Sequence, residues 1–164
     1  MSPGDFVENV EPHYAGLVQR LSLVLHDAEE ARDIAQDSYL RAWRAWDRFD
    51  GADTRAWLHT IGLRLAFNRR RRLRHFAVAL ARTRVAAPPP GWVPAERMDL
   101  WDALAELRPQ QRAAILLNVL DGYTQAEIAT MLDARPGTVA SWIASGKERL
   151  RFRLSHGAPS EVAR

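Results

Sequence analysis

Apolar residues in the first half of the chain recur at intervals of three and four, from Phe6 to about Arg84. This spacing is the period of an α-helix, whereas a strand would alternate apolar and polar residues. The apolar positions of the clearest helix are Ala31, Ile34, Ala35, Tyr39, Ala42, Trp43 and Trp46. A break at residues 51–54 separates it from a helix that contains Trp57 and ends in arginines. The pattern predicts a helical bundle over residues 1–84.

A proline-rich segment follows, with the sequence VAAPPPGWVP at residues 85–94. Proline removes a backbone donor and disfavours helix in the residue before it, so the segment predicts a linker. Its three consecutive prolines favour an extended and rather stiff conformation. We therefore expect a first domain over 1–84, a linker over 85–98, a second domain over 99–156 and a disordered tail over 157–164.

The second domain repeats the helical period in four shorter segments. The first is a short helix with Leu100, Trp101, Leu104 and Leu107, and the second begins at Pro109 and ends before Gly122. A capping box of Thr124 with Glu127 would begin the third helix, and Pro136 would begin the fourth. Residues 133–135 would join the last two helices tightly, as in a helix-turn-helix. Spacing alone leaves a DNA-binding pair and an ordinary helical hairpin both open. The predicted fold class is all-α, with two small helical domains.

Charge is segregated along the chain, although the formal net charge is only +3. Residues 1–53 carry five arginines against eleven acidic residues, and residues 54–84 carry nine arginines and no acid. The run Arg69 to Arg72 could neutralise phosphates, or could be a solvated helix end beside the negative pole of the helix dipole. Charge alone does not separate these two interpretations.

Six tryptophans raise the alternative of stacking on nucleic-acid bases. Four of them fall on apolar stripes, so we expect core packing for Trp43, Trp46, Trp57 and Trp101. The role of Trp142 stays open at this point.

Composition argues against an enzyme, a metal site and a cofactor. The chain has no cysteine, no glycine-rich phosphate loop and five scattered histidines, and its carboxylates lie on charged helix faces where burial would not tune their pKa. The acidic start lacks the features of a signal peptide, and the apolar stretches are too short to span a bilayer. We expect a cytoplasmic protein with no membrane insertion.

Residues 27–44, DAEEARDIAQDSYLRAWR, closely resemble region two of the extracytoplasmic-function (ECF) group of RNA polymerase sigma factors. The segments DRFDG at 47–51 and WLHTI at 57–61, followed by Arg69 to Arg72, keep that family's order of elements. The resemblance implies that this region clasps the largest subunit of the polymerase and melts the minus-ten element. It assigns the polymerase contact to Asp33, Gln36, Asp37 and Arg41. Composition alone would also allow a solvated face with weak ion pairs there.

Residues 104–154 resemble region four of the same family, through LRPQQR at 107–112, DGYTQAEIA at 121–129 and PGTVASW at 136–142. The resemblance implies a helix set into the minus-thirty-five groove. Together the two regions imply DNA contacts by Trp57, Arg64, Asn68, Arg69, Arg70, Arg71, Arg72, Arg135, Thr138, Ser141, Trp142, Lys147 and Arg149.

The departures from the family pattern lie where DNA would be read. Ala140, Trp142 and Ser145 stand where the family usually has Lys or Arg, which make the commonest specific contacts to guanine. Loop 49–56 is about one residue short, and Arg64 replaces an Asn that could both donate and accept. We therefore expect weak reading of the minus-thirty-five element and a larger share of phosphate contacts.

The resemblance implies a sigma factor whose partners are core RNA polymerase, promoter DNA and an anti-sigma protein. The alternative is a sigma-like regulator that keeps the protein-binding surfaces but has reduced or lost promoter reading. A repressor that uses only the second domain would leave the acidic helix of the first domain without a purpose.

Overall fold

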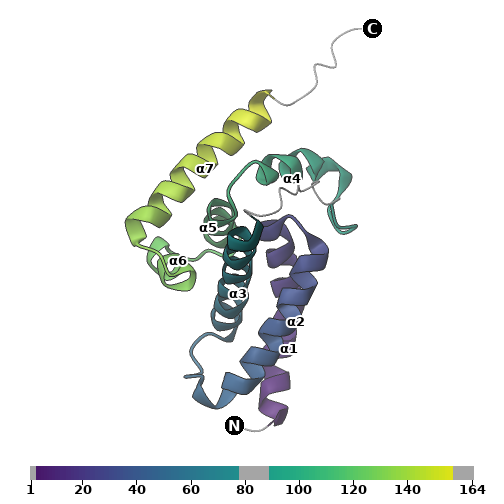
Figure 1. The fold of residues 1–164 in the computed structure, drawn as a ribbon, viewed down its shortest axis with the longest axis vertical. Coiled ribbons are helices and arrows are strands. Elements are labelled where there is room, and N and C mark those ends of the chain that lie inside the picture. The colour runs from purple at the N-terminus through teal and green to yellow at the C-terminus, as the bar shows by residue number, and fades with distance from the viewer. Residues whose placement is uncertain (1–2, 78–88, 157–164) are drawn as a thin grey trace.

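The computed structural model describes residues 3–77 and 89–156, and every regular element in these two ranges is helical. Seven α-helices and two short 3₁₀ helices, η1 and η2, form the described part of the chain (Figure 1). The all-α prediction with two small helical domains is confirmed. The expectations of a helical pattern up to Arg84 and of a disordered tail over 157–164 fall on residues outside this description.

The first domain packs three long helices side by side: α1 (Pro3–Leu25), α2 (Ala28–Ala45) and α3 (Thr54–Ala77), with η1 (Trp46–Arg48) after α2. Asp27 caps α2, since its carboxylate accepts hydrogen bonds from the backbone N–H groups of Glu29 and Glu30 at 3.1 and 2.9 Å. The buried core of this domain is built from Phe6, Leu17, Leu21, Ile34, Leu58 and Leu63.

The short η2 (Ala95–Arg97) lies at the end of the predicted linker and leads into the second domain, which is built from α4 (Met98–Ala105), α5 (Pro109–Val119), α6 (Gln125–Leu132) and α7 (Pro136–His156). These elements occupy the segments that the apolar spacing predicted. The long α7 runs past α6 and α5 and ends beyond the rest of the fold (Figure 1).

Local signals fixed the ends of the helices in this domain. The Glu127 carboxylate accepts from the Thr124 N–H at 2.7 Å, and the Thr124 hydroxyl accepts from the Glu127 N–H at 3.3 Å, so the predicted capping box is confirmed. Gly122 follows α5 with a φ of +76°, and Asp133 ends α6 with a φ of +52°. Pro136 is the first residue of α7, as predicted.

The tryptophans follow the prediction with one correction. Trp46 and Trp101 are buried and Trp57 is partly buried, but Trp43 is 45% exposed, so its assignment to the core was wrong. Trp43 lies at the margin of the apolar stripe, where its ring meets the edge of Phe6 at a centroid distance of 5.1 Å and leaves the rest of the indole open.

The two domains pack directly against each other. Helix α5 contacts α1 and α6 contacts α3, and Figure 1 shows α6 lying beside α3. One continuous hydrophobic cluster includes residues of both domains, such as Leu21 and Leu63 in the first and Leu117 and Ile128 in the second. The sequence predicted two units but not this shared core.

Candidate protein and nucleic-acid interfaces

The predicted polymerase contacts form one exposed face of α2. Asp33, Gln36, Asp37 and Arg41 are all exposed, while the opposite side of the helix is buried against α1 and α3. The periodicity that buries Ile34 and Ser38 therefore turns these four side chains outward. We call the four residues the docking stripe.

An apolar side chain lies within this stripe and was missed by the sequence reasoning. Leu40 is 47% exposed and stands one helical turn after Gln36 and Asp37. Trp43 follows three residues later and is also exposed. The signal was present in the spacing 33, 36, 37, 40, which places Leu40 on the charged face. The face of α2 that carries the docking stripe thus presents charged side chains together with exposed apolar side chains, a mixture that is found in protein interfaces.

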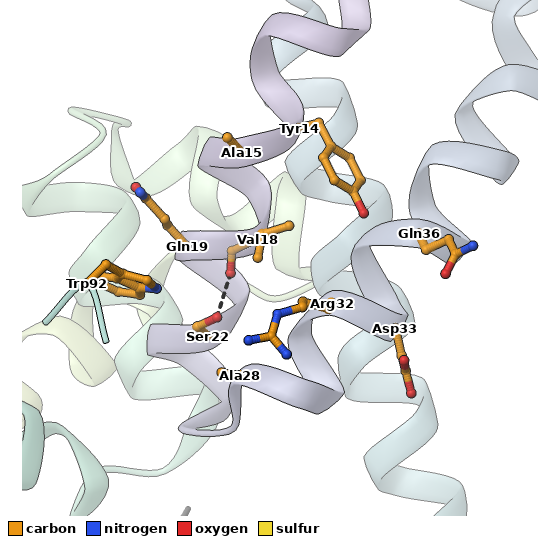
Figure 2. Close-up of a pocket in the computed structure, with 10 residues that line it drawn as sticks. All are labelled: Tyr14, Ala15, Val18, Gln19, Ser22, Ala28, Arg32, Asp33, Gln36 and Trp92. Atoms are coloured by element: carbon orange, nitrogen blue, oxygen red, sulfur yellow. Dashed lines mark hydrogen bonds between the residues drawn. The ribbon is translucent and has the colours of Figure 1, made fainter. Parts of the chain in front are cut away.

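A groove of about 590 Å³ borders the docking stripe between α1, α2 and the segment after the prolines. Figure 2 shows Asp33 and Gln36 at one side of the groove and Trp92 at the other. The Ser22 hydroxyl within it donates to the Val18 carbonyl at 2.8 Å. The remaining lining residues are Tyr14, Ala15, Gln19, Ala28 and Arg32.

Some of the predicted DNA contacts on α3 are exposed to solvent, whereas others already contact residues of the protein itself. Arg69 and Arg72 are exposed, and Arg71 donates to the Asn68 side chain at 3.3 Å. Trp57 is partly buried and stacks on Phe49 with centroids 4.5 Å apart. One face of its indole is therefore already occupied.

Arg70 makes contacts inside the first domain. Its guanidinium pairs with the Glu30 carboxylate at 2.7 Å and donates to the Leu25 carbonyl at 2.7 Å. Both charged side chains are largely buried, at 13% and 10% exposure. The basic run was expected to hold phosphates as a group, but this member ties α3 to the ends of α1 and α2.

Arg64 reaches into the second domain. It donates to the backbone carbonyls of Thr130 and Met131, at 2.7 and 3.2 Å. These carbonyls belong to the last turn of α6, where the Thr130 carbonyl has only a long backbone hydrogen bond, 3.5 Å from the Asp133 N–H, and where the helix dipole favours a cation. The residue that departs from the family pattern is thus a contact between domains in this structure.

The predicted contacts in the second domain are gathered on the first half of α7 and just before it. Arg135, Thr138 and Ser141 are exposed and Trp142 is partly buried, because Val139 and Ile143 form the inner side of the helix. Lys147 and Arg149 are exposed one to two turns further along. The structure brings Thr138, Ser141 and Trp142 to one end of the helix.

Asp121 is a buried carboxylate at the junction of the domains, and no sequence signal marked it. Its side chain has no exposed area and accepts from Arg20 of α1 at 2.8 Å and from Arg55 of α3. Two guanidinium groups around one carboxylate compensate the cost of burying its charge.

Two buried histidines lie near the same junction. Burial lowers the pKa of His59 to about 4, and the neighbouring Arg55 acts in the same direction. Burial likewise lowers the pKa of His26 to about 4, and its ring stacks on Trp101 of the second domain at 4.0 Å. Both rings are therefore neutral near pH 7.

Metal-binding clusters and membrane spans do not occur in the described ranges. Within residues 3–77 and 89–156, no group of three His, Asp or Glu side chains is arranged to hold a metal. No helix in the described part of the chain is long and apolar enough to cross a bilayer.

Comparison with known proteins assigns the two domains. Residues 6–76 match the family model for sigma-70 region 2, and residues 97–150 match the model for sigma-70 region 4. The ECF RNA polymerase sigma factor SigL of Mycobacterium tuberculosis is 32% identical over 150 residues, which cover 86% of this chain and 84% of SigL. The chain belongs to the ECF group of RNA polymerase sigma factors. The ECF assignment and the predicted order of region 2 before region 4 are confirmed.

Other relatives and solved structures agree with this assignment. The ECF sigma factor SigE of Mycolicibacterium smegmatis is 34% identical over 147 residues, which cover 85% of this chain but 56% of SigE. The sigma factor RpoE of Bartonella quintana, in complex with the anti-sigma factor NepR, superimposes with a TM-score of 0.76 at 26% identity, covering 93% of this chain and 98% of RpoE. CnrH, in complex with the cytosolic domain of CnrY, gives a TM-score of 0.66 at 25% identity over 94% of this chain and 90% of CnrH. Sigma factors are not a family of catalytic enzymes.

Proposed function

We propose that this sigma factor binds core RNA polymerase through the docking stripe and directs promoter recognition and transcription initiation. The observation that carries the proposal is the matched pair of regions 2 and 4 together with a docking stripe whose four side chains are all exposed on α2. The protein would act in the cytoplasm, have no catalysis of its own, and divide into a first domain over 1–84, a linker over 85–98 and a second domain over 99–156.

The DNA contacts would come from both domains. The exposed guanidiniums of Arg69, Arg71 and Arg72 would hold phosphates near the minus-ten element, and each such contact adds salt dependence without sequence information. The first half of α7 would enter the minus-thirty-five groove with Thr138, Ser141 and Trp142 facing the bases. Arg135, Lys147 and Arg149 would contact the backbone.

An anti-sigma protein would be a further partner. RpoE and CnrH, which share the arrangement of both domains with this chain, are each solved with a protein bound, and RpoE's partner is an anti-sigma factor. The groove beside the docking stripe would place such a partner where it competes with the polymerase.

The alternative is a sigma-like regulator with reduced or lost promoter reading. It is suggested by the first half of α7, which has Ala140, Trp142 and Ser145 where the family usually has Lys or Arg. The curated relatives, named as sigma factors, favour the first function. Transcription reconstituted from core polymerase, this protein and a library of random promoters separates the two. Defined transcripts that depend on the protein support the proposal. Tight core binding with no transcript from any promoter would overturn it.

A further inference from the structure

A buried arginine at the junction of the two domains has no partner for its charge. Arg112 belongs to α5 and is only 4% exposed. Its Nε and Nη1 atoms have no hydrogen-bond partner, and among the described residues no carboxylate forms an ion pair with its guanidinium. A buried charge without a counter-charge is strongly unfavourable. The described residues therefore leave this guanidinium both uncompensated and unsatisfied.

Arg112 keeps its charge at neutral pH. Burial lowers the pKa of its guanidinium to about 10, and the positive charge of Arg70 acts in the same direction. A group with this pKa is still protonated near pH 7. Water molecules would satisfy its N–H groups, but only an anion would also compensate its charge.

Two groups of the first domain lie at the same place. Arg70 of α3 donates to the carbonyl of Leu25 at 2.7 Å, and His26 follows directly at the end of α1. His26 is 9% exposed, and its Nδ1 has no hydrogen-bond partner. Burial lowers the pKa of His26 to about 4, and the charge of Arg112 is the next cause. The imidazole of one domain and the guanidinium of the other are therefore close neighbours.

The acidic side chains near this junction leave the charge of Arg112 unbalanced. The Glu30 carboxylate already pairs with Arg70 at 2.7 Å. Asp102 of α4 is exposed, and its charge raises the pKa of His26 but is not among the causes that shift the pKa of Arg112. The junction thus has an excess of positive charge in its buried part.

The surroundings of these groups limit what can bind there. Arg112 and His26 are each more than nine-tenths buried, and the His26 ring stacks on Trp101 of α4 with centroids 4.0 Å apart. A nucleic-acid duplex cannot approach such groups, whereas a ligand group of a few atoms can. The N–H groups of a guanidinium form a planar fork, which matches the oxygen atoms of phosphate better than it matches a spherical ion.

We propose that the domain junction is a binding site for a small oxyanion, either inorganic phosphate or the phosphate group of a nucleotide, held by Arg112 and His26. A neutral imidazole can donate from Nδ1, and Arg70 adds positive charge beside the site while it keeps its own pair with Glu30. Arg112 and His26 belong neither to the docking stripe nor to the predicted DNA contacts. The site is therefore independent of the proposed function.

Thermal unfolding of the full chain tests the site. Inorganic phosphate or AMP is added in steps, and KCl is lowered so that the ionic strength stays constant. A ligand that binds only the folded protein raises its melting temperature, by roughly 4 °C at ten times the dissociation constant. A rise with phosphate would identify the free anion as a ligand, and a rise with AMP alone would identify a nucleotide phosphate. No rise with either would overturn the proposal.

A pair of matched variants separates the site from the general stabilising effect of phosphate salts on proteins. Arg112→Met removes the guanidinium and keeps an unbranched side chain, so it should abolish the rise. Arg97→Met makes the same change at an exposed arginine of η2 and should keep the rise in full. An equal rise in the two variants would show that phosphate does not bind at Arg112.

His26→Phe provides a second variant that does not depend on the folding of Arg112→Met. It removes the Nδ1 donor and keeps an aromatic ring against Trp101. The dissociation constant of the anion, measured by isothermal titration calorimetry, should rise roughly tenfold because one hydrogen bond to a charged group is lost. An unchanged dissociation constant would refute the site. None of these measurements uses polymerase or DNA, so their failure is distinct from a failure of the proposed function.

Discussion

Arg20 and Asp121 form an ion pair of 2.8 Å although 101 residues separate them in the chain. The carboxylate has no exposed area, and 13% of the Arg20 side chain is exposed. Because a buried charge that loses its partner is costly, this pair couples the positions of the two domains. The stability and the DNA affinity of one domain therefore depend on the position of the other domain.

Reversing the charge of Asp37 should abolish binding to core polymerase. Asp37→Arg places a cation in the middle of the docking stripe, where a complementary surface would repel it. Because Asp37 is exposed on the outer face of α2, the stability of the protein should not change. Association with core polymerase, followed by fluorescence anisotropy of the labelled protein, measures the effect.

The control is Glu96→Arg, the same charge reversal at an exposed carboxylate of η2, just before the second domain. It should bind core polymerase as the unmodified protein does. Equal binding by both variants would remove the docking stripe from the interface.

Two neighbouring arginines should behave differently when each is changed to alanine. Arg72 is exposed, so Arg72→Ala should keep the free energy of unfolding and lower the salt dependence of promoter binding by about one unit of the log–log slope. Arg70 is paired with the buried Glu30, so Arg70→Ala should cost roughly 2 kcal/mol of stability. Urea denaturation and salt titrations of the polymerase–promoter complex distinguish the two. Equal loss of stability in both variants would contradict the structure.

The stability of the protein should fall as the pH falls from about 6.5 to about 4. The folded-state pKa of His59 is lowered to about 4, so in this window the unfolded state binds the proton and the folded state does not. The stability is at its full value above pH 6.5, and the loss amounts to about 3 kcal/mol once the pH has fallen to the folded-state pKa.

Urea denaturation at a series of pH values measures this slope. His59→Leu should make the slope shallower, whereas His156→Gln, at an exposed histidine near the end of α7, should leave it as it was. A slope that His59→Leu does not alter would show that another group is responsible.

The capping box of α6 should be worth about 1 kcal/mol. Thr124→Ala removes the hydroxyl that accepts from the Glu127 N–H, and losses of this size are usual for a Thr cap. Thr130→Ala is a matched control because Thr130 lies inside the same helix, where alanine is favoured. Thermal unfolding should show a lower melting temperature for the first variant only; an equal fall in both would argue against a specific role of the cap.

The sequence alone determined the helices and most of their ends. Period, proline, glycine and capping residues act within a few positions of one another, so the roles of Thr124, Glu127 and Pro136 follow from their local sequence. The same period placed Asp33 and Asp37 on one outward face. It misplaced Trp43, because the margin of an apolar stripe is buried or exposed according to its neighbours in space.

Only the tertiary structure decided which helix faces meet across the two domains. Periodicity tells which side of a helix is apolar but not which distant segment will cover it, so nothing marked Asp121 as the partner of Arg20 and Arg55. The run of arginines looked uniform in sequence, yet Arg70 is paired inside the first domain while Arg72 is exposed. Arg64 was expected on DNA and instead donates to carbonyls at the end of α6, since carbonyl oxygens at a helix C-terminus can accept hydrogen bonds from a guanidinium and the helix dipole favours a cation there.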